Sequence, residues 1–112
     1  MDLSDFEFLT KRLIKQRIRI AIARQSPHEG VADEFELFDA DLRAKHEKAL
    51  AKLQPITPSV QDKLSRIVHN AFIEMTREAR ENYGHGEMVV LGLAEFTESF
   101  HPESLLPAQA FA

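Results

Sequence analysis

The chain contains no cysteine among its 112 residues. The absence of thiols excludes disulfide bonds, thiolate-bound metals and a cysteine nucleophile, and it is compatible with a reducing compartment. The segment from Met1 to Asp5 is acidic, whereas a secretory signal begins with basic residues. We therefore expect a cytoplasmic protein.

Long apolar runs are also lacking, because consecutive apolar residues extend over only a few positions. A membrane-spanning helix needs about 20 such residues, so we expect no membrane association. Apolar residues make up 44% and charged residues 29% of the chain, which is typical of a globular domain. The length predicts a single domain over residues 1–112.

Signatures of catalysis and of metal binding are missing from the sequence. There is no Gly-x-Ser-x-Gly motif, and the glycine pair around His85 follows a predicted helix, unlike a phosphate-binding loop. No two histidines stand three or four residues apart, and Glu98 and His101 form a single Glu-x-x-His without the second set that a di-iron bundle needs. We expect no enzyme, no metal and no cofactor, and we expect His46 and His69 to lie at the border between core and surface with exposed polar tips.

The apolar pattern predicts an all-α fold with three main helices, at about residues 4–24, 32–54 and 58–83. Within the first segment, residues 17–22 also alternate as a half-buried strand would, but the helical stripe continues without interruption from Phe6. The apolar stripe of the second helix includes Phe38. Thr57 followed by a proline is a strong start signal for the third helix.

The sequence beyond Gly86 has a different character. Residues 88–96 are short and mostly apolar, and the pattern leaves open whether they form a fourth helix or a strand. Residues 97–112 form a tail that is expected either to pack along the helices or to extend onto another molecule. From Glu81 onward the chain carries five acidic residues and neither lysine nor arginine.

Charge is distributed in blocks along the first two predicted helices. The stretch from Phe8 to His28 has six basic and no acidic residues, and residues 29–41 have six acidic and no basic residues. Two helices joined by a short turn lie antiparallel, so the blocks are expected to face each other. The resulting expected neighbours are Arg24 and Asp33, Arg19 and Glu36, Arg17 and Asp39, Lys15 and Asp41, Glu7 and Lys48, and Asp5 and Lys52.

Some basic residues are left without a carboxylate in this register, because Lys11 lies level with Lys45. They define a possible site for phosphate groups, and hence an alternative function as a nucleic-acid-associated regulator. The candidate polyanion contacts are Lys11, Arg12, Lys15, Lys45 and Lys48.

Apolar residues of the C-terminal part exceed what a small monomer readily buries, and surplus apolar surface indicates an interface. The candidate interface residues are Met88, Val90, Leu91, Leu93, Phe96, Phe100, Leu105, Leu106 and Phe111. The favoured function is a small cytoplasmic, non-enzymatic adaptor or regulatory protein that binds other proteins and forms a homodimer. A hetero-partner held by the tail, or a tail that closes the helical bundle, remain as alternatives.

Overall fold

Four α-helices and one short 3-10 helix make up the structure, a computed structural model that describes residues 2–26 and 30–107. Neither a strand nor a helix long and apolar enough to cross a membrane occurs within these ranges. The all-helical prediction is therefore confirmed, and residues 88–96 belong to a fourth helix. The elements are α1 (Ser4–Ala23), α2 (Val31–Ala51), α3 (Pro58–Tyr83), α4 (Glu87–Ser99) and the 3-10 helix η1 (Pro102–Leu105).

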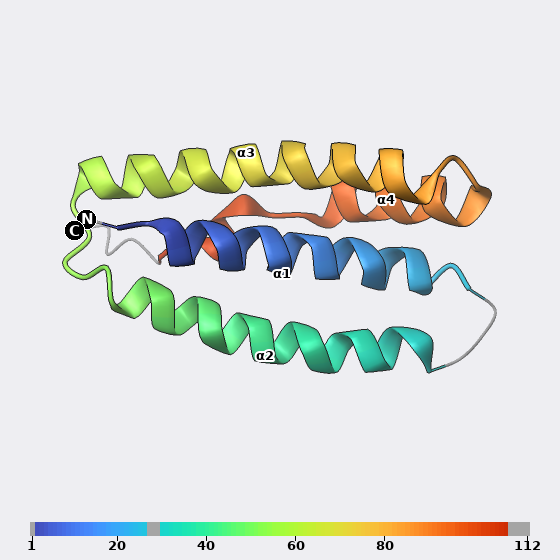
Figure 1. Ribbon diagram of the computed structural model, residues 1–112, viewed down its shortest axis with the longest axis horizontal. Coiled ribbons are helices and arrows are strands. Elements are labelled where there is room, and N and C mark those ends of the chain that lie inside the picture. The colour runs from blue at the N-terminus through green and yellow to red at the C-terminus, as the bar shows by residue number, and fades with distance from the viewer. Residues whose placement is uncertain (1, 27–29, 108–112) are drawn as a thin grey trace.

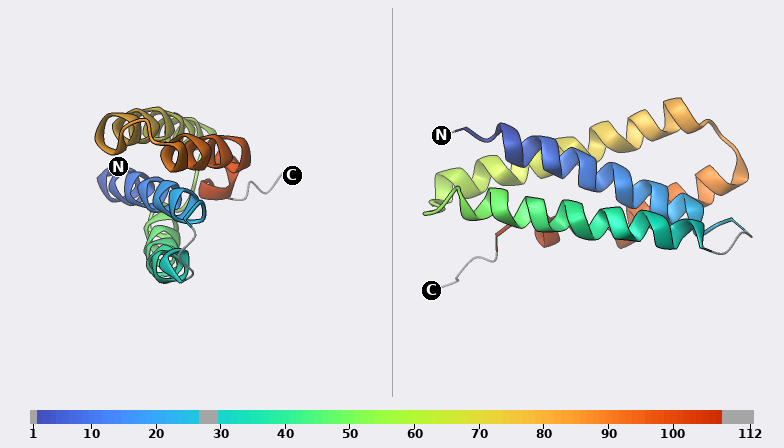
Figure 2. Two further views of the ribbon diagram at one scale, coloured as in Figure 1. Left: turned by 90° about the vertical axis from the view of Figure 1, so that its right-hand side faces the viewer. Right: turned by 60° about the horizontal axis from the view of Figure 1, so that its bottom comes forward.

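Helix α1 occupies the centre of the arrangement (Figures 1 and 2). It packs extensively against α2, α3 and α4, whereas α2 packs extensively only against α1. In the end-on view of Figure 2, α2 lies on one side of α1, and α3 and α4 lie on the other. Because α2 has one neighbour, it exposes a larger share of its circumference than α1 does.

The helix ends follow local chemistry that the sequence makes visible. The Thr57 side chain accepts a hydrogen bond from the Val60 amide at 3.2 Å, and Pro58 occupies the first turn of α3, as predicted. Gly84 ends α3 with φ of +80°, and Gly30 precedes α2 with φ of +91°, a region that favours glycine.

The hydrophobic core surrounds α1. Leu13 and Ile14 are fully buried, and so are Leu64 and Val68 of α3. Contributions from α2 and α4 are smaller, with Leu42 and Ala49 from α2, Leu53 from the segment after it, and Leu93 and Phe96 from α4. Burial of this apolar surface is the main force that holds the four helices together.

Buried polar contacts join α1 to α2. The Gln16 side-chain amide donates to the Phe35 carbonyl at 3.0 Å, and Thr10 hydrogen-bonds His46 at 3.0 Å. Buried polar groups need such partners, because an unsatisfied group costs about 1–3 kcal/mol. These contacts therefore fix the position of α2 along α1.

Helices α1 and α4 approach each other very closely at Gly92. A Cβ atom at this position would lie 2.6 Å from the Ile22 Cα and 2.8 Å from the Ile22 backbone nitrogen. No other residue type fits without separating the helices, because backbone atoms cannot turn aside as side chains do.

The predicted tail is folded as far as residue 107. Its first residues end α4, and η1 packs against α3, where Leu105 is 2% exposed. Between these elements, the Phe100 ring stacks on the Phe72 ring of α3 with 5.0 Å between centroids. Of the two arrangements left open by the sequence, this part of the tail packs along its own helices.

Candidate functional site

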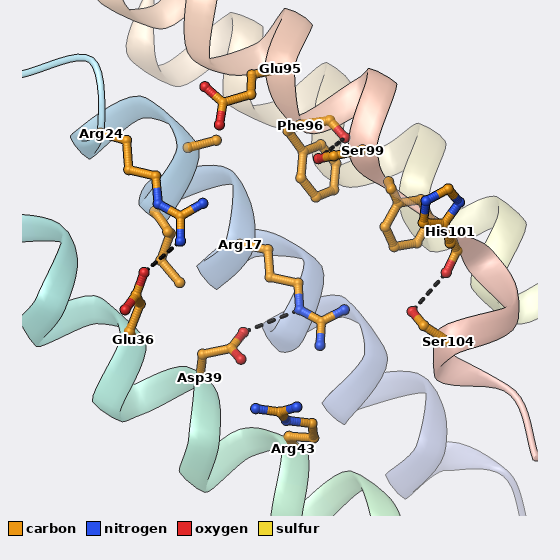
Figure 3. A pocket seen from close by; sticks show the side chains of 13 residues that line it. Arg17, Arg24, Glu36, Asp39, Arg43, Glu95, Phe96, Ser99, His101 and Ser104 are labelled. Atoms are coloured by element: carbon orange, nitrogen blue, oxygen red, sulfur yellow. Dashed lines mark hydrogen bonds and ion pairs between the residues drawn. The ribbon is translucent and has the colours of Figure 1, made fainter.

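A groove of about 580 Å³ lies between α1 and α2 on one side and α4 and the following segment on the other (Figure 3). It exists because α2 packs against α1 and leaves the space beside α4 open. This volume lies within the range of about 300–1,000 Å³ that ligand sites occupy.

The floor of the groove is apolar. Ile20 and Ala21 of α1 supply one half, and Phe96 and Phe100 supply the other. The two aromatic rings lie 5.3 Å apart and belong to a cluster with Phe72, which anchors them against α3. A partner side chain placed here would meet a preformed surface of aromatic and aliphatic groups.

The walls of the groove are charged and mostly paired. The Arg17 Nε donates to Asp39 at 3.2 Å, and Arg24 pairs with Glu36 at 2.5 Å (Figure 3). Glu95 accepts a hydrogen bond from Gln25 at 2.7 Å.

Arg43 is the exception among the arginines of this groove. It is exposed, and it forms no hydrogen bond or ion pair within the part of the chain that the structure describes. An unpaired guanidinium beside an apolar floor is suited to bind a carboxylate from outside the chain, because its fork of donors matches two oxygen atoms.

The far end of the groove carries His101 and Ser104. The Ser104 hydroxyl donates to the His101 carbonyl at 2.7 Å, and the His101 Nδ1 lies 3.8 Å from Glu103. Among the described residues, no three histidine, aspartate or glutamate side chains gather to hold a metal ion. The arrangement offers shape, apolar contact and charge, which are means of binding.

The predicted charge pairing between α1 and α2 forms only in part. Arg17 and Asp39 pair as expected, whereas Arg24 contacts Glu36 in place of Asp33. Lys15 pairs with Glu78 of α3 at 3.3 Å and not with Asp41. The remaining expected pairs, Arg19 with Glu36, Glu7 with Lys48 and Asp5 with Lys52, are not among the ion pairs of the described residues.

The physical reason is the face of α1 on which each residue lies. Lys11, Lys15 and Arg19 recur at four-residue intervals and share the face toward α3. Acidic residues of α3 therefore neutralise Lys15, which was expected to pair with Asp41 of α2, and Lys11, which was expected to have no acidic partner.

The candidate polyanion contacts do not form one free basic surface. Lys11 pairs with Glu74 at 3.0 Å, a hydrogen bond that raises the pKa of Lys11, and Lys45 pairs with Asp41 at 3.0 Å. Arg12 lies over the Phe8 ring, 5.5 Å from its centroid. Together with the Lys15 pair, these contacts leave Lys48 as the candidate that has no partner among the described residues.

The candidate interface residues divide into buried and exposed sets. Leu93, Phe96 and Leu105 are buried in the core, and Phe100 and Leu106 pack against it. Phe111 lies outside the described residues. The members at the surface are Met88, Val90 and Leu91.

His46 was expected at the border between core and surface with its polar tip exposed, and this prediction is wrong. The residue is 3% exposed, because its ring lies between Thr10 and the Phe6 ring, whose centroid is 4.9 Å away. Burial, and to a lesser extent the nearby Arg17 charge, together lower the pKa of His46 from its ordinary value of 6.5 to about 4. His46 is therefore neutral at physiological pH.

Acid is expected to destabilise the fold through His46. Since the folded-state pKa lies below the unfolded value, this contribution to stability is complete above about pH 7 and is lost as pH falls from about 6.5 to 4. Between pH 7 and 5 the free energy of unfolding should fall by about 2 kcal/mol more in the wild type than in His46→Gln, which cannot titrate. Urea unfolding at both pH values measures this difference, and an equal loss in both proteins would refute the assignment.

The opposite side of α2 carries exposed apolar residues beside a second hollow of about 370 Å³. Leu37 is 75% and Phe38 is 62% exposed, the highest values among the large apolar side chains. The sequence placed Phe38 on the buried stripe of the second helix, which is wrong. A helix with one neighbour buries a narrow stripe, and here that stripe is centred on Leu42 and His46.

Comparison with known proteins reveals no relative. The sequence matches no protein-family model, and no curated protein or solved structure matches it significantly. The function is therefore inferred from the residues of this chain.

Proposed function

We propose that this chain is a small cytoplasmic, non-enzymatic adaptor or regulatory protein that binds a segment of another protein in the groove beside α2. The observation that carries the proposal is the preformed apolar floor of Ile20, Ala21, Phe96 and Phe100 between charged walls. A protein segment can fill such a site with apolar side chains and still keep its polar groups toward the walls.

The charge of the groove favours a polypeptide over a polyanion. Its three arginines are matched by three acidic residues: Glu36, Asp39 and Glu95. A site for nucleic acid needs a surplus of positive charge along a continuous surface, because phosphate contacts supply most of the affinity. A peptide with charges of both signs complements these walls better.

Arg43 gives the partner a recognisable feature. Because Arg17 and Arg24 are held by carboxylates of α2, Arg43 is the arginine of the groove left to bind an acidic side chain. We infer that the partner segment places an aspartate or glutamate beside an apolar anchor residue. Truncation of a well-placed charged contact of this kind commonly costs more than 1 kcal/mol of binding free energy.

Charge reversal at Arg43 tests the proposal. Arg43→Glu is expected to reduce partner affinity at least tenfold, because it removes the contact and adds repulsion, while helix stability changes by only a few tenths of a kcal/mol. The measurement is affinity capture from the native host, followed by titration of the captured protein against each variant.

Arg77→Glu is the matched control, because Arg77 is exposed on α3, lies outside the groove and forms no ion pair among the described residues. It should retain the partner at wild-type affinity. A second groove variant, Ser99→Arg, should block the groove from the α4 side. Retention of every partner by Arg43→Glu and Ser99→Arg, or the absence of any specific partner, would contradict the proposal.

A further inference from the structure

A second surface follows one side of α2, away from the groove. Its members recur at three- or four-residue intervals, so they form one stripe along the helix, with Phe38 beside it. All are exposed in the structure. The outer face of α2 comprises Glu34, Leu37, Phe38, Asp41, Lys45, Lys48 and the residue that caps the end of the helix, Lys52.

The outer face combines the most exposed apolar side chains with unused charge. Leu37 and Phe38 project from the helix at 75% and 62% exposure. Glu34, Lys48 and Lys52 form no ion pair with any described residue, and Asp41 pairs only with Lys45, one turn away. Such a face offers both apolar contact and charges that are free to pair with another molecule.

The charges on α2 are separated by sign. Residues 33–41 include five acidic residues and no basic residue, whereas residues 42–52 include four basic residues and a single acidic residue, Glu47. The helix is therefore complementary to a reversed copy of itself. A parallel copy would place acidic half against acidic half, which is unfavourable.

We propose that two copies of this chain associate through the outer faces of their α2 helices, antiparallel and related by a two-fold axis level with residue 43. In this register Glu34 lies level with Lys52 of the second copy, and Phe38 lies level with its Lys48. Asp41 lies level with the second copy's Lys45, so the two existing Asp41–Lys45 pairs combine into a ring of four alternating charges at the axis. Each contact occurs twice, as a two-fold interface requires.

The self-complementary charge makes a second copy the favoured occupant over an unrelated helix. Leu37 and Phe38 would lie against the aliphatic stems of lysines, which cover apolar surface while their ammonium groups reach carboxylates or aromatic faces. A single helix of 21 residues is about 30 Å long, so the interface is smaller than the roughly 800 Å² per partner of tight complexes. The dimer should therefore be of micromolar affinity and salt-sensitive.

The absence of cysteine from the chain allows a direct test of this geometry. In the proposed dimer, Ala44→Cys places the two thiols close to the axis, whereas Glu34→Cys places them about 27 Å apart along the helices. A short bismaleimide reagent should therefore crosslink Ala44→Cys and not Glu34→Cys. A parallel pair would crosslink both variants, and that result would overturn the proposal.

Sedimentation of the full chain over about 1 μM to 1 mM measures the association itself. Leu37→Asp should weaken it at least tenfold, because it removes an apolar contact, while Ile73→Asp, at an exposed apolar residue of α3, should leave it unchanged. Glu34→Lys and Lys52→Glu should each weaken it roughly threefold, and the double variant should recover wild-type affinity. A monomer throughout this range would refute the proposal, also if a different protein binds the outer face. A dimer whose affinity is unchanged by Leu37→Asp would refute it as well.

Discussion

Gly92→Val should lower the free energy of unfolding by about 3 kcal/mol or more. A Cβ at Gly92 would lie within 2.8 Å of two backbone atoms of Ile22, and those atoms move only if α1 moves. Valine adds two further methyl groups at the same place. The substitution is therefore expected to force α4 away from α1 and to open the apolar surface that joins them.

Helix propensity acts in the opposite direction, which makes the test sharper. Valine is a better helix former than glycine by a few tenths of a kcal/mol, so the same substitution at an exposed position of α4 would stabilise the helix. Ala94→Val, at an exposed position two residues away, is the control and should change stability by less than about 1 kcal/mol. Urea unfolding of both variants measures their free energies of unfolding. An unchanged stability of Gly92→Val would show that α1 and α4 are not in close contact.

Leu105→Ala should cost about 2–4 kcal/mol of stability. The side chain is 2% exposed and belongs to the hydrophobic core, at the place where η1 packs against α3. Its removal leaves a cavity, and the loss of transfer free energy adds to the loss of packing. The segment that follows α4 is thus expected to stabilise the fold of its own chain.

Glu103→Ala provides the matched control for this segment, because Glu103 is exposed in the same 3-10 helix. It should change stability by no more than about 0.5 kcal/mol. If Leu105→Ala were as stable as Glu103→Ala, the tail would not be part of the core, and an interface role for Leu105 would become the better explanation.

Local signals made much of the helical architecture predictable. Thr57 and Pro58 mark the start of α3, and Gly84 marks its end, because capping and positive φ depend on residues a few positions apart. The sequence left the fourth helix open, since a segment of nine residues that are mostly apolar, residues 88–96, fits a strand as well. The role of Gly92 could not be predicted from its neighbours in the sequence, because it depends on Ile22, 70 residues away.

The ion pairs show why the candidate site was harder to predict. The register of the first two helices was sufficient for Arg17 and Asp39, which lie on facing sides. It failed for Lys15 because a register gives the level of a residue and says nothing about its direction around the helix. The acidic partners of that face, Glu74 and Glu78, belong to α3 and could be identified only once α3 was placed beside α1.

The exposure of Phe38 and the burial of His46 have a common cause. An amphipathic pattern identifies an apolar face, but it does not tell how many neighbours the helix has. Helix α2 packs extensively against one neighbour, α1, so its buried stripe is narrow and shifted toward His46. The His46 ring forms a hydrogen bond with Thr10. This shift also leaves open both sides of α2, where the groove and the outer face lie.

The most direct test of the central claim is an NMR titration of the full chain, in which its amide chemical shifts are recorded. The titrant is the captured partner protein, which the Arg77→Glu control variant still binds. Binding in the groove predicts changes concentrated at Ile20, Ala21, Phe96 and Phe100, and Arg43→Glu should move these changes to at least tenfold higher partner concentration. Changes concentrated at the exposed residues Met88, Val90 and Leu91, with an unaltered groove, would contradict the account.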